Sequence, residues 1–234
     1  MRKIAFLIGF GFSLVIKAQP MINLEFFDDN RLQWGYYFGL NTIDFKFDYQ
    51  NFDYTRTISP HQIDVQVEKS LGFNVGLTGD IRLIKYLNLR FEPGLIYNQR
   101  KLHFAGFTDA RDQVREVNST YIYFPLLLKY STKRWYNFKP YITAGASATI
   151  NLSANHKIST DNSEMKFRMK QHSFFYEVGF GIDFYTAHFR FSPSIRGLFS
   201  MRNELIPDKD PNSGWTGNLN GIYTRGIMLN LTFE

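Results

Sequence analysis

The side chains with the clearest catalytic potential in this 234-residue sequence are its five histidines, at positions 61, 103, 156, 172 and 188. A histidine beside a carboxylate can act as a general base. His61 and Asp64 form the closest such pair along the chain, and His103 precedes Asp109 by six residues. Together with Asp112 they could converge in folded loops, but nothing in their spacing requires it. We therefore interpret them as solvated loop residues.

Other catalytic classes lack their motifs in this sequence. There is no HExxH, no GxSxG, no P-loop and no dinucleotide-binding fingerprint. The chain also has no cysteine, which excludes disulfides, thiolate metal sites, a cysteine nucleophile and the acylated cysteine of a bacterial lipoprotein. We expect no catalytic residues, no cofactor, no metal and no small-molecule substrate.

A second group of reactive side chains consists of acids and bases that occupy alternate positions within otherwise apolar segments. The group contains both signs of charge, so its members can pair if the fold encloses them together. Its members are Asp80, Arg82, Arg90, Glu92, Lys129, Glu177, Asp183, Arg190 and Arg196.

The segments that carry these charges alternate with a period of two, which is typical of β-strands. The aromatic content of 18% also favours strands. Near Thr42 the phase of the alternation slips, and we interpret this slip as a β-bulge. Eight such segments are predicted, at 34–49, 71–82, 87–98, 121–130, 141–151, 174–184, 189–196 and 223–233.

The connections between these segments alternate between long and short. Outer-membrane barrels have long extracellular loops and short periplasmic turns. The sequence therefore predicts an all-β fold over residues 33–234, an eight-stranded antiparallel up-and-down transmembrane β-barrel in a bacterial outer membrane, with both termini periplasmic. The long connections lie near 50–70, 99–117, 152–172 and 201–219, and the short ones near 84–86, 131–138 and 185–187.

The charged positions must then point into the barrel. A Lys or Arg facing lipid at mid-membrane costs about 2–4 kcal/mol, so several of them on the lipid face would exceed the stability of an ordinary domain. An eight-stranded barrel is just wide enough for its own side chains to fill. We predict a plugged lumen with no channel, and we favour a structural role for its charges over a catalytic or proton-relay role.

The N-terminus carries an export signal, with Arg2 and Lys3 before an apolar run at 4–16. We predict a signal peptide at 1–18, with the mature chain starting at Gln19, and a periplasmic segment at 19–32. Removing the signal takes three cations and no acid from the net charge of +6, leaving +3. The remaining basic residues are dispersed, so no nucleic-acid partner is expected.

Several motifs resemble PorT-type proteins of the Bacteroidota, and together they span most of the mature chain. Position 123 departs from that pattern, because Tyr123 stands where an acidic partner for Lys129 would be expected. The motifs are Phe-Phe-Asp-Asp at 26–29, Trp-Gly-Tyr-Tyr-Phe-Gly-Leu-Asn at 34–41, Leu-Asn-Leu-Arg-Phe-Glu-Pro-Gly-Leu at 87–95, Phe-Pro-Leu-Leu-Leu-Lys-Tyr at 124–130 and Lys-Pro-Tyr-Ile at 139–142.

This resemblance implies a non-enzymatic outer-membrane component required for type IX protein secretion, a route associated with gliding motility. Its partners would be outer-membrane lipid and other type IX secretion components. We expect Phe26, Phe27, Asp28 and Asp29 to form a docking segment, with a disordered tether as the alternative. Two other hypotheses remain open: a general structural or adhesin-type barrel acting through its loops, and a hydrolase or acyltransferase at the rim.

Overall fold

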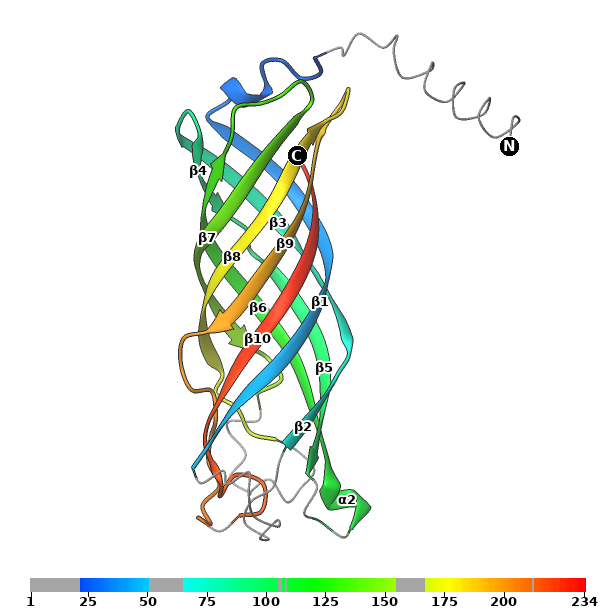
Figure 1. Ribbon diagram of the computed structural model, residues 1–234, viewed down its shortest axis with the longest axis vertical. Coiled ribbons are helices and arrows are strands. Elements are labelled where there is room, and N and C mark those ends of the chain that lie inside the picture. Colours follow the sequence, from blue (N-terminus) through cyan, green and yellow to red (C-terminus); the bar gives the residue numbers. More distant parts are fainter. Residues whose placement is uncertain (1–21, 51–64, 105–106, 108, 155–166, 212) are drawn as a thin grey trace, which may run out of the picture.

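The computed structural model describes residues 22–50, 65–104, 107, 109–154, 167–211 and 213–234 (Figure 1). The predicted signal peptide, His61 and Asp64 lie outside these residues. The elements in chain order are η1 (Phe27–Asp29), β1 (Leu32–Tyr49), β2 (Val65–Lys69), β3 (Leu71–Ile84), β4 (Leu87–Phe91), β5 (Gly94–Phe104), α2 (Ala110–Gln113), β6 (Val114–Ser131), β7 (Phe138–Asn151), β8 (His172–Tyr185), β9 (Arg190–Ser200) and β10 (Leu219–Phe233).

The strands close into one antiparallel ring, because β1 pairs with β10 on one side and with β3 on the other. β2 and β3 together form one long strand interrupted at Ser70, and β4 and β5 form another interrupted at Glu92 and Pro93. Counted this way, the ring has eight strands, and the predicted up-and-down barrel is confirmed. Figure 1 shows the described N-terminal residues and Glu234 at one end of the barrel, here called the terminal end. The opposite end is called the loop end.

The interruption between β4 and β5 follows from Pro93, which has no N–H to donate to a neighbouring strand. The Tyr37 side chain enters the lumen beside this point, and its hydroxyl donates to the Glu92 carbonyl at 3.3 Å. Its ring occupies the space above Gly76 and Gly94, which face each other across β3 and β5. A Cβ on Gly94 would lie 2.3 Å from the Tyr37 hydroxyl oxygen, so this contact requires glycine.

Outward-facing side chains form an apolar belt around the barrel. On β1 the belt runs from Leu32 to Leu40 at every second residue, and on β3 it runs from Leu71 to Leu77. The residues between them, such as Asn74, are buried in the lumen. None of the short helical turns in the described ranges is long and apolar enough to cross a membrane.

The bulge predicted at Thr42 is wrong. The pairing of β1 with β10 is continuous from Tyr36 to Asp48, and it shifts only between Asp48 and Tyr49. The residue types change at Thr42 while the backbone alternation continues, so Ile43 and Phe45 are buried inside and Lys46 is exposed outside. The strand leaves the apolar belt here, so its outer face becomes polar and its inner face apolar.

An apolar core fills the lumen at the loop end, where the belt has ended. It explains why β5 continues to Phe104 and β6 begins at Val114, within the connection predicted near 99–117. The added strand residues bury apolar side chains inside the barrel, as in a soluble β-protein. The core consists of Phe45, Val65, Leu102, Phe104, Val117, Phe167, Met169, Leu205, Leu219 and Ile222.

The apolar belt predicts that the cost of introducing a charge depends strongly on whether the residue lies inside the belt or beyond it. Leu77→Arg, in the belt on β3, should lower the free energy of unfolding by about 2–4 kcal/mol in lipid vesicles, because the guanidinium must enter hydrocarbon. Gln66→Arg is the control, since Gln66 is exposed on β2 beyond the belt, and it should change stability by less than about 0.5 kcal/mol. Denaturant titration followed by tryptophan fluorescence measures both; equal costs would contradict this placement of the belt.

Candidate functional site

Buried charges gather in the lumen on the terminal-end side of the molecule. They come from β3, β4, β6, β8 and β9 and from the break after β4, and strand alternation directs them inward. Eight of the nine charged residues singled out from the sequence are buried there: Asp80, Arg90, Glu92, Lys129, Glu177, Asp183, Arg190 and Arg196.

Asp80 lies at the centre of this cluster. Arg90 holds it with a two-pronged contact, Nε donating to Oδ1 at 2.6 Å and Nη2 to Oδ2 at 2.7 Å. Arg190 donates to the same carboxylate from β9 at 3.1 Å. Arg90 also reaches Glu92 through Nη1 at 3.2 Å. One carboxylate thus joins two guanidinium groups that approach from different strands.

Lys129 completes a second group with Asp183 of β8. Its Nζ donates to both carboxylate oxygens, at 2.8 and 2.9 Å, and it lies 4.1 Å from the centre of the Tyr141 ring. The Ser192 hydroxyl donates to Asp183 at 2.7 Å. The acidic partner of Lys129 therefore comes from β8, which is separated from β6 by β7 in the ring.

Tyr123 belongs to a third group around Glu177. Its hydroxyl lies 2.6 and 2.7 Å from the two oxygens of that carboxylate. Arg196 contacts Glu177 through Nη1 at 3.4 Å and Glu92 through Nη2 at 2.6 Å. The phenol donates to a carboxylate, which an acid at position 123 would do only if it were protonated.

Two residues differ from what the sequence suggested. Arg82 lies outside the cluster, and its guanidinium donates to the backbone carbonyls of Asp28 and Asp29 at 2.5 and 2.9 Å. Glu234 was not singled out, yet its side chain is fully buried, accepts a hydrogen bond from Arg190 Nε at 3.0 Å and lies 2.6 Å from Arg190 Nη2. Glu234 is two residues after Thr232, which points into the lumen, so strand alternation was sufficient to predict that Glu234 also points inward. Four cations thus face five carboxylates in the lumen.

The segment expected to dock partners lies across the terminal end of the barrel. The Asp28 carboxylate accepts from the Tyr185 hydroxyl at 2.8 Å and pairs with Lys139 at 3.4 Å. The Phe27 ring lies 4.9 Å from the Arg190 guanidinium. Phe26, by contrast, is 74% exposed. Phe27 and Asp28 are therefore engaged by the barrel itself, while Phe26 and Asp29 face outward.

The arrangement resembles a structural network more than a reactive centre, because each ionised group in it has an opposite charge in contact. Among the described residues, no three His, Asp or Glu side chains are grouped to hold a metal ion. At the loop end, His103 pairs with Glu68 at 2.9 Å and Asp112 pairs with Arg115 at 3.1 Å. These contacts differ from the catalytic pairings considered for the rim.

Comparison with known proteins gives the following matches. The family model described as "Outer membrane protein beta-barrel domain" matches residues 17–205. No curated protein matches the chain. Among solved structures, OprG from Pseudomonas aeruginosa is 15% identical, covering 86% of this chain and 94% of that chain with a TM-score of 0.47. Ail of Yersinia pestis, solved with the heparin analogue sucrose octasulfate, is 12% identical, with coverages of 87% and 99% and a TM-score of 0.40. AlkL in DMPC bilayers is 12% identical, with coverages of 86% and 88% and a TM-score of 0.42.

The network predicts that removing one buried partner is far more costly than removing an exposed one. Asp183→Asn removes the nearer carboxylate of Lys129 and leaves it only Asp80, at 3.7 Å, so it should lower the free energy of unfolding by about 3–5 kcal/mol. Arg225→Met removes a half-exposed pair with Asp44 and should cost about 0–1 kcal/mol. The double variant Lys129→Met/Asp183→Leu should recover much of the loss. Denaturant unfolding in one detergent measures all three; similar costs for Asp183→Asn and Arg225→Met would contradict the network.

Proposed function

Because the chain belongs to the outer membrane protein beta-barrel domain family, we propose that it acts in the bacterial outer membrane as a closed, non-enzymatic barrel that anchors and docks other proteins. The observation that carries this proposal is the ion-pair network across the lumen. Arg190 of β9 reaches Asp80 of β3 at 3.1 Å, and Lys129 of β6 reaches Asp183 of β8 at 2.8 Å. A solute would have to break these buried pairs to pass.

The apolar core at the loop end supports the same proposal, because it blocks the lumen a second time. Phe45 and Phe104 are 3% and 1% exposed within it. An ion passing this core would have to leave water for an apolar interior, which is strongly unfavourable. With polar pairs near one end and a packed core near the other, the useful surfaces of the protein are its two ends.

We assign the docking role to type IX protein secretion, with the terminal end in the periplasm and the loops outside the cell. This assignment rests on the PorT-like segments, including Arg-Phe-Glu-Pro-Gly at 90–94. Two members of that segment, Arg90 and Glu92, contact each other in the lumen. On the periplasmic side, the exposed Phe26 and Asp29 form the surface offered to other secretion components.

A second candidate function is binding at the cell surface through the loop end. The observation that favours it is the extension of the barrel beyond its apolar belt. There the outward residues of β1, β2 and β5 are charged, as at Lys46, Glu68 and Lys101. This part would stand in water above the membrane and could contact a partner.

A deletion strain distinguishes the two candidates. Loss of the chain should trap type IX cargo inside the cell, and the full-length chain should restore export. A chain carrying Phe26→Ala and Asp29→Ala should fold, reach the membrane and restore export poorly, because it lacks the proposed docking surface. The readout is the ratio of secreted to periplasmic cargo by immunoblot.

Charge-reversed variants of the loop-end residues Lys46 and Lys101 are the matched control, and they should restore export fully. Normal export in the deletion strain would overturn the secretion role. Loss of surface binding in the loop-end variants, with export intact, would instead support the second candidate.

A further inference from the structure

Arg100 of β5 is the buried arginine whose charge is least well compensated. Its side chain is 1% exposed. Arg90, Arg190 and Arg196 each contact carboxylates in the network, and at the loop end Arg115 pairs with Asp112 and Arg168 with Asp208. Among the residues that the structure describes, Arg100 has no carboxylate within 4.0 Å.

The guanidinium of Arg100 is only partly hydrogen-bonded. Nη2 donates to the Ser119 hydroxyl and, at 3.3 Å, to the Tyr121 hydroxyl. The Phe45 ring lies 4.0 Å from its central carbon. Nε and Nη1 are buried and donate to no acceptor in the described part of the chain. A buried cation in contact with Phe45 of the apolar core carries a large desolvation penalty.

Glu204 is the carboxylate that could balance this charge from a distance. Arg100 is near enough to lower the pKa of Glu204, although burial has the larger effect and raises that pKa overall. One oxygen of Glu204 accepts from the Thr224 hydroxyl at 2.7 Å, and the other has no hydrogen-bond partner among the described residues. The two groups are thus near enough to interact but do not form an ion pair.

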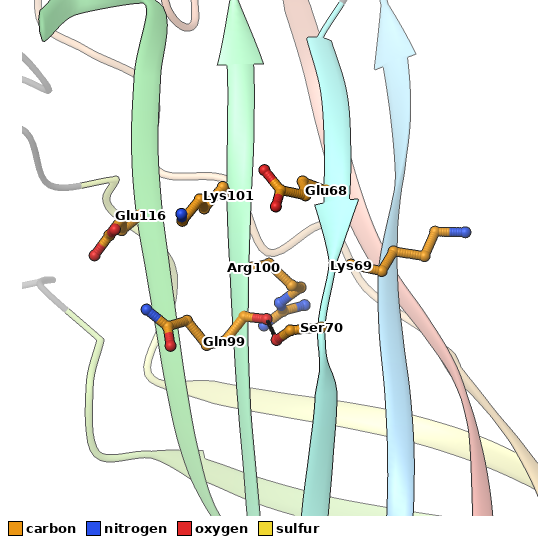
Figure 2. Close-up of a pocket in the computed structure, with 7 residues that line it drawn as sticks. All are labelled: Glu68, Lys69, Ser70, Gln99, Arg100, Lys101 and Glu116. Atoms are coloured by element: carbon orange, nitrogen blue, oxygen red, sulfur yellow. Dashed lines mark hydrogen bonds between the residues drawn. The ribbon is translucent and has the colours of Figure 1, made fainter.

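The wall beside Arg100 has a pocket of about 270 Å³ on its outer side. It lies where β2 ends and Ser70 interrupts the strand, and the pairing of β1 with β3 also ends at this level, with Thr42 opposite Leu71. Figure 2 shows the Arg100 side chain between β5 and β2, beside Ser70. The pocket is lined by Glu68, Lys69, Ser70, Gln99, Arg100, Lys101 and Glu116.

We propose that Arg100 is a binding site for a small monovalent anion of the chloride class, which reaches the lumen through this pocket. The free N–H groups of Arg100 donate to the anion. The hydroxyls of Ser119 and Tyr121 accept from Arg100 and can donate their own protons to the same anion. Lys101 lines the mouth together with Glu68 and Glu116, and the Lys69 amine pairs with Asp44 at 3.0 Å. The preference for an anion therefore rests on Arg100 itself, and a larger anion such as gluconate would not fit among the packed side chains around it.

Thermal unfolding in detergent at constant ionic strength tests the site, with chloride replaced stepwise by gluconate. A ligand that binds the folded state raises the melting temperature, so each tenfold rise in chloride above its dissociation constant should raise Tm by about 3–6 °C. Arg100→Met should abolish this dependence. Arg115→Met is the matched control, because it removes a buried arginine that has its own carboxylate, and the dependence should persist.

Tyr121→Phe keeps the ring and removes one proposed donor, so it should weaken the chloride dependence and serves if Arg100→Met does not fold. Anomalous scattering from a bromide-soaked crystal should place a single peak within hydrogen-bond distance of Arg100. A wild-type Tm independent of chloride would overturn the proposal. Equal chloride dependence of Tm in wild type and in Arg100→Met would also overturn it. If Arg100→Met does not fold, the same comparison is made with Tyr121→Phe. Either result would mean that Phe45 and Glu204 are sufficient to compensate the charge of Arg100.

Discussion

The cost of placing a charge in hydrocarbon is the constraint on which the rest of this structure depends. Strands that cross a membrane can carry Arg, Lys, Asp and Glu only on the face that turns away from lipid. Once these groups share a narrow lumen, each needs an opposite charge to compensate it, because an uncompensated buried charge is strongly destabilising. Asp80, held by Arg90 and Arg190, shows the result. The ion-pair network therefore follows from closing a sheet with charged residues on one face into a small barrel.

The same constraint explains where the pattern reverses. Beyond Thr42 the outward side chains of β1 are charged and the inward ones are Ile43, Phe45 and Phe47. Charged groups on the outside indicate water there, and in water a barrel is stabilised by burying apolar surface within it. The pairing of β1 with β3 also stops at Thr42. Open backbone edges are tolerated in water but not in hydrocarbon, so both changes place the edge of the membrane at the same residue.

Alternation along the chain was sufficient to predict the all-β fold, the number of strands in the ring and the inward direction of most buried charges. It could not predict which charges meet, because neighbours across the lumen depend on the stagger of the strands. Lys129 thus pairs with the Asp183 carboxylate, which lies on the strand two places along the ring. At Thr42 the strand leaves the apolar belt, so the apolar residues move from its outward positions to its inward positions. A β-bulge would shift the sequence pattern in the same way, so the sequence alone could not distinguish the two. Arg82 lies at the barrel mouth, where it contacts two backbone carbonyls and the exposed Asp29 carboxylate instead of the buried charges.

In this structure, side chains fill the lumen from one end to the other. The conductance of the purified, refolded protein in a planar lipid bilayer tests this filling, with folding checked by circular dichroism in the same preparation. A filled lumen should give no steady single-channel current in concentrated salt at any moderate voltage. A reproducible ohmic conductance from the wild-type protein would show an open path past Asp80 and Phe45, and would contradict it.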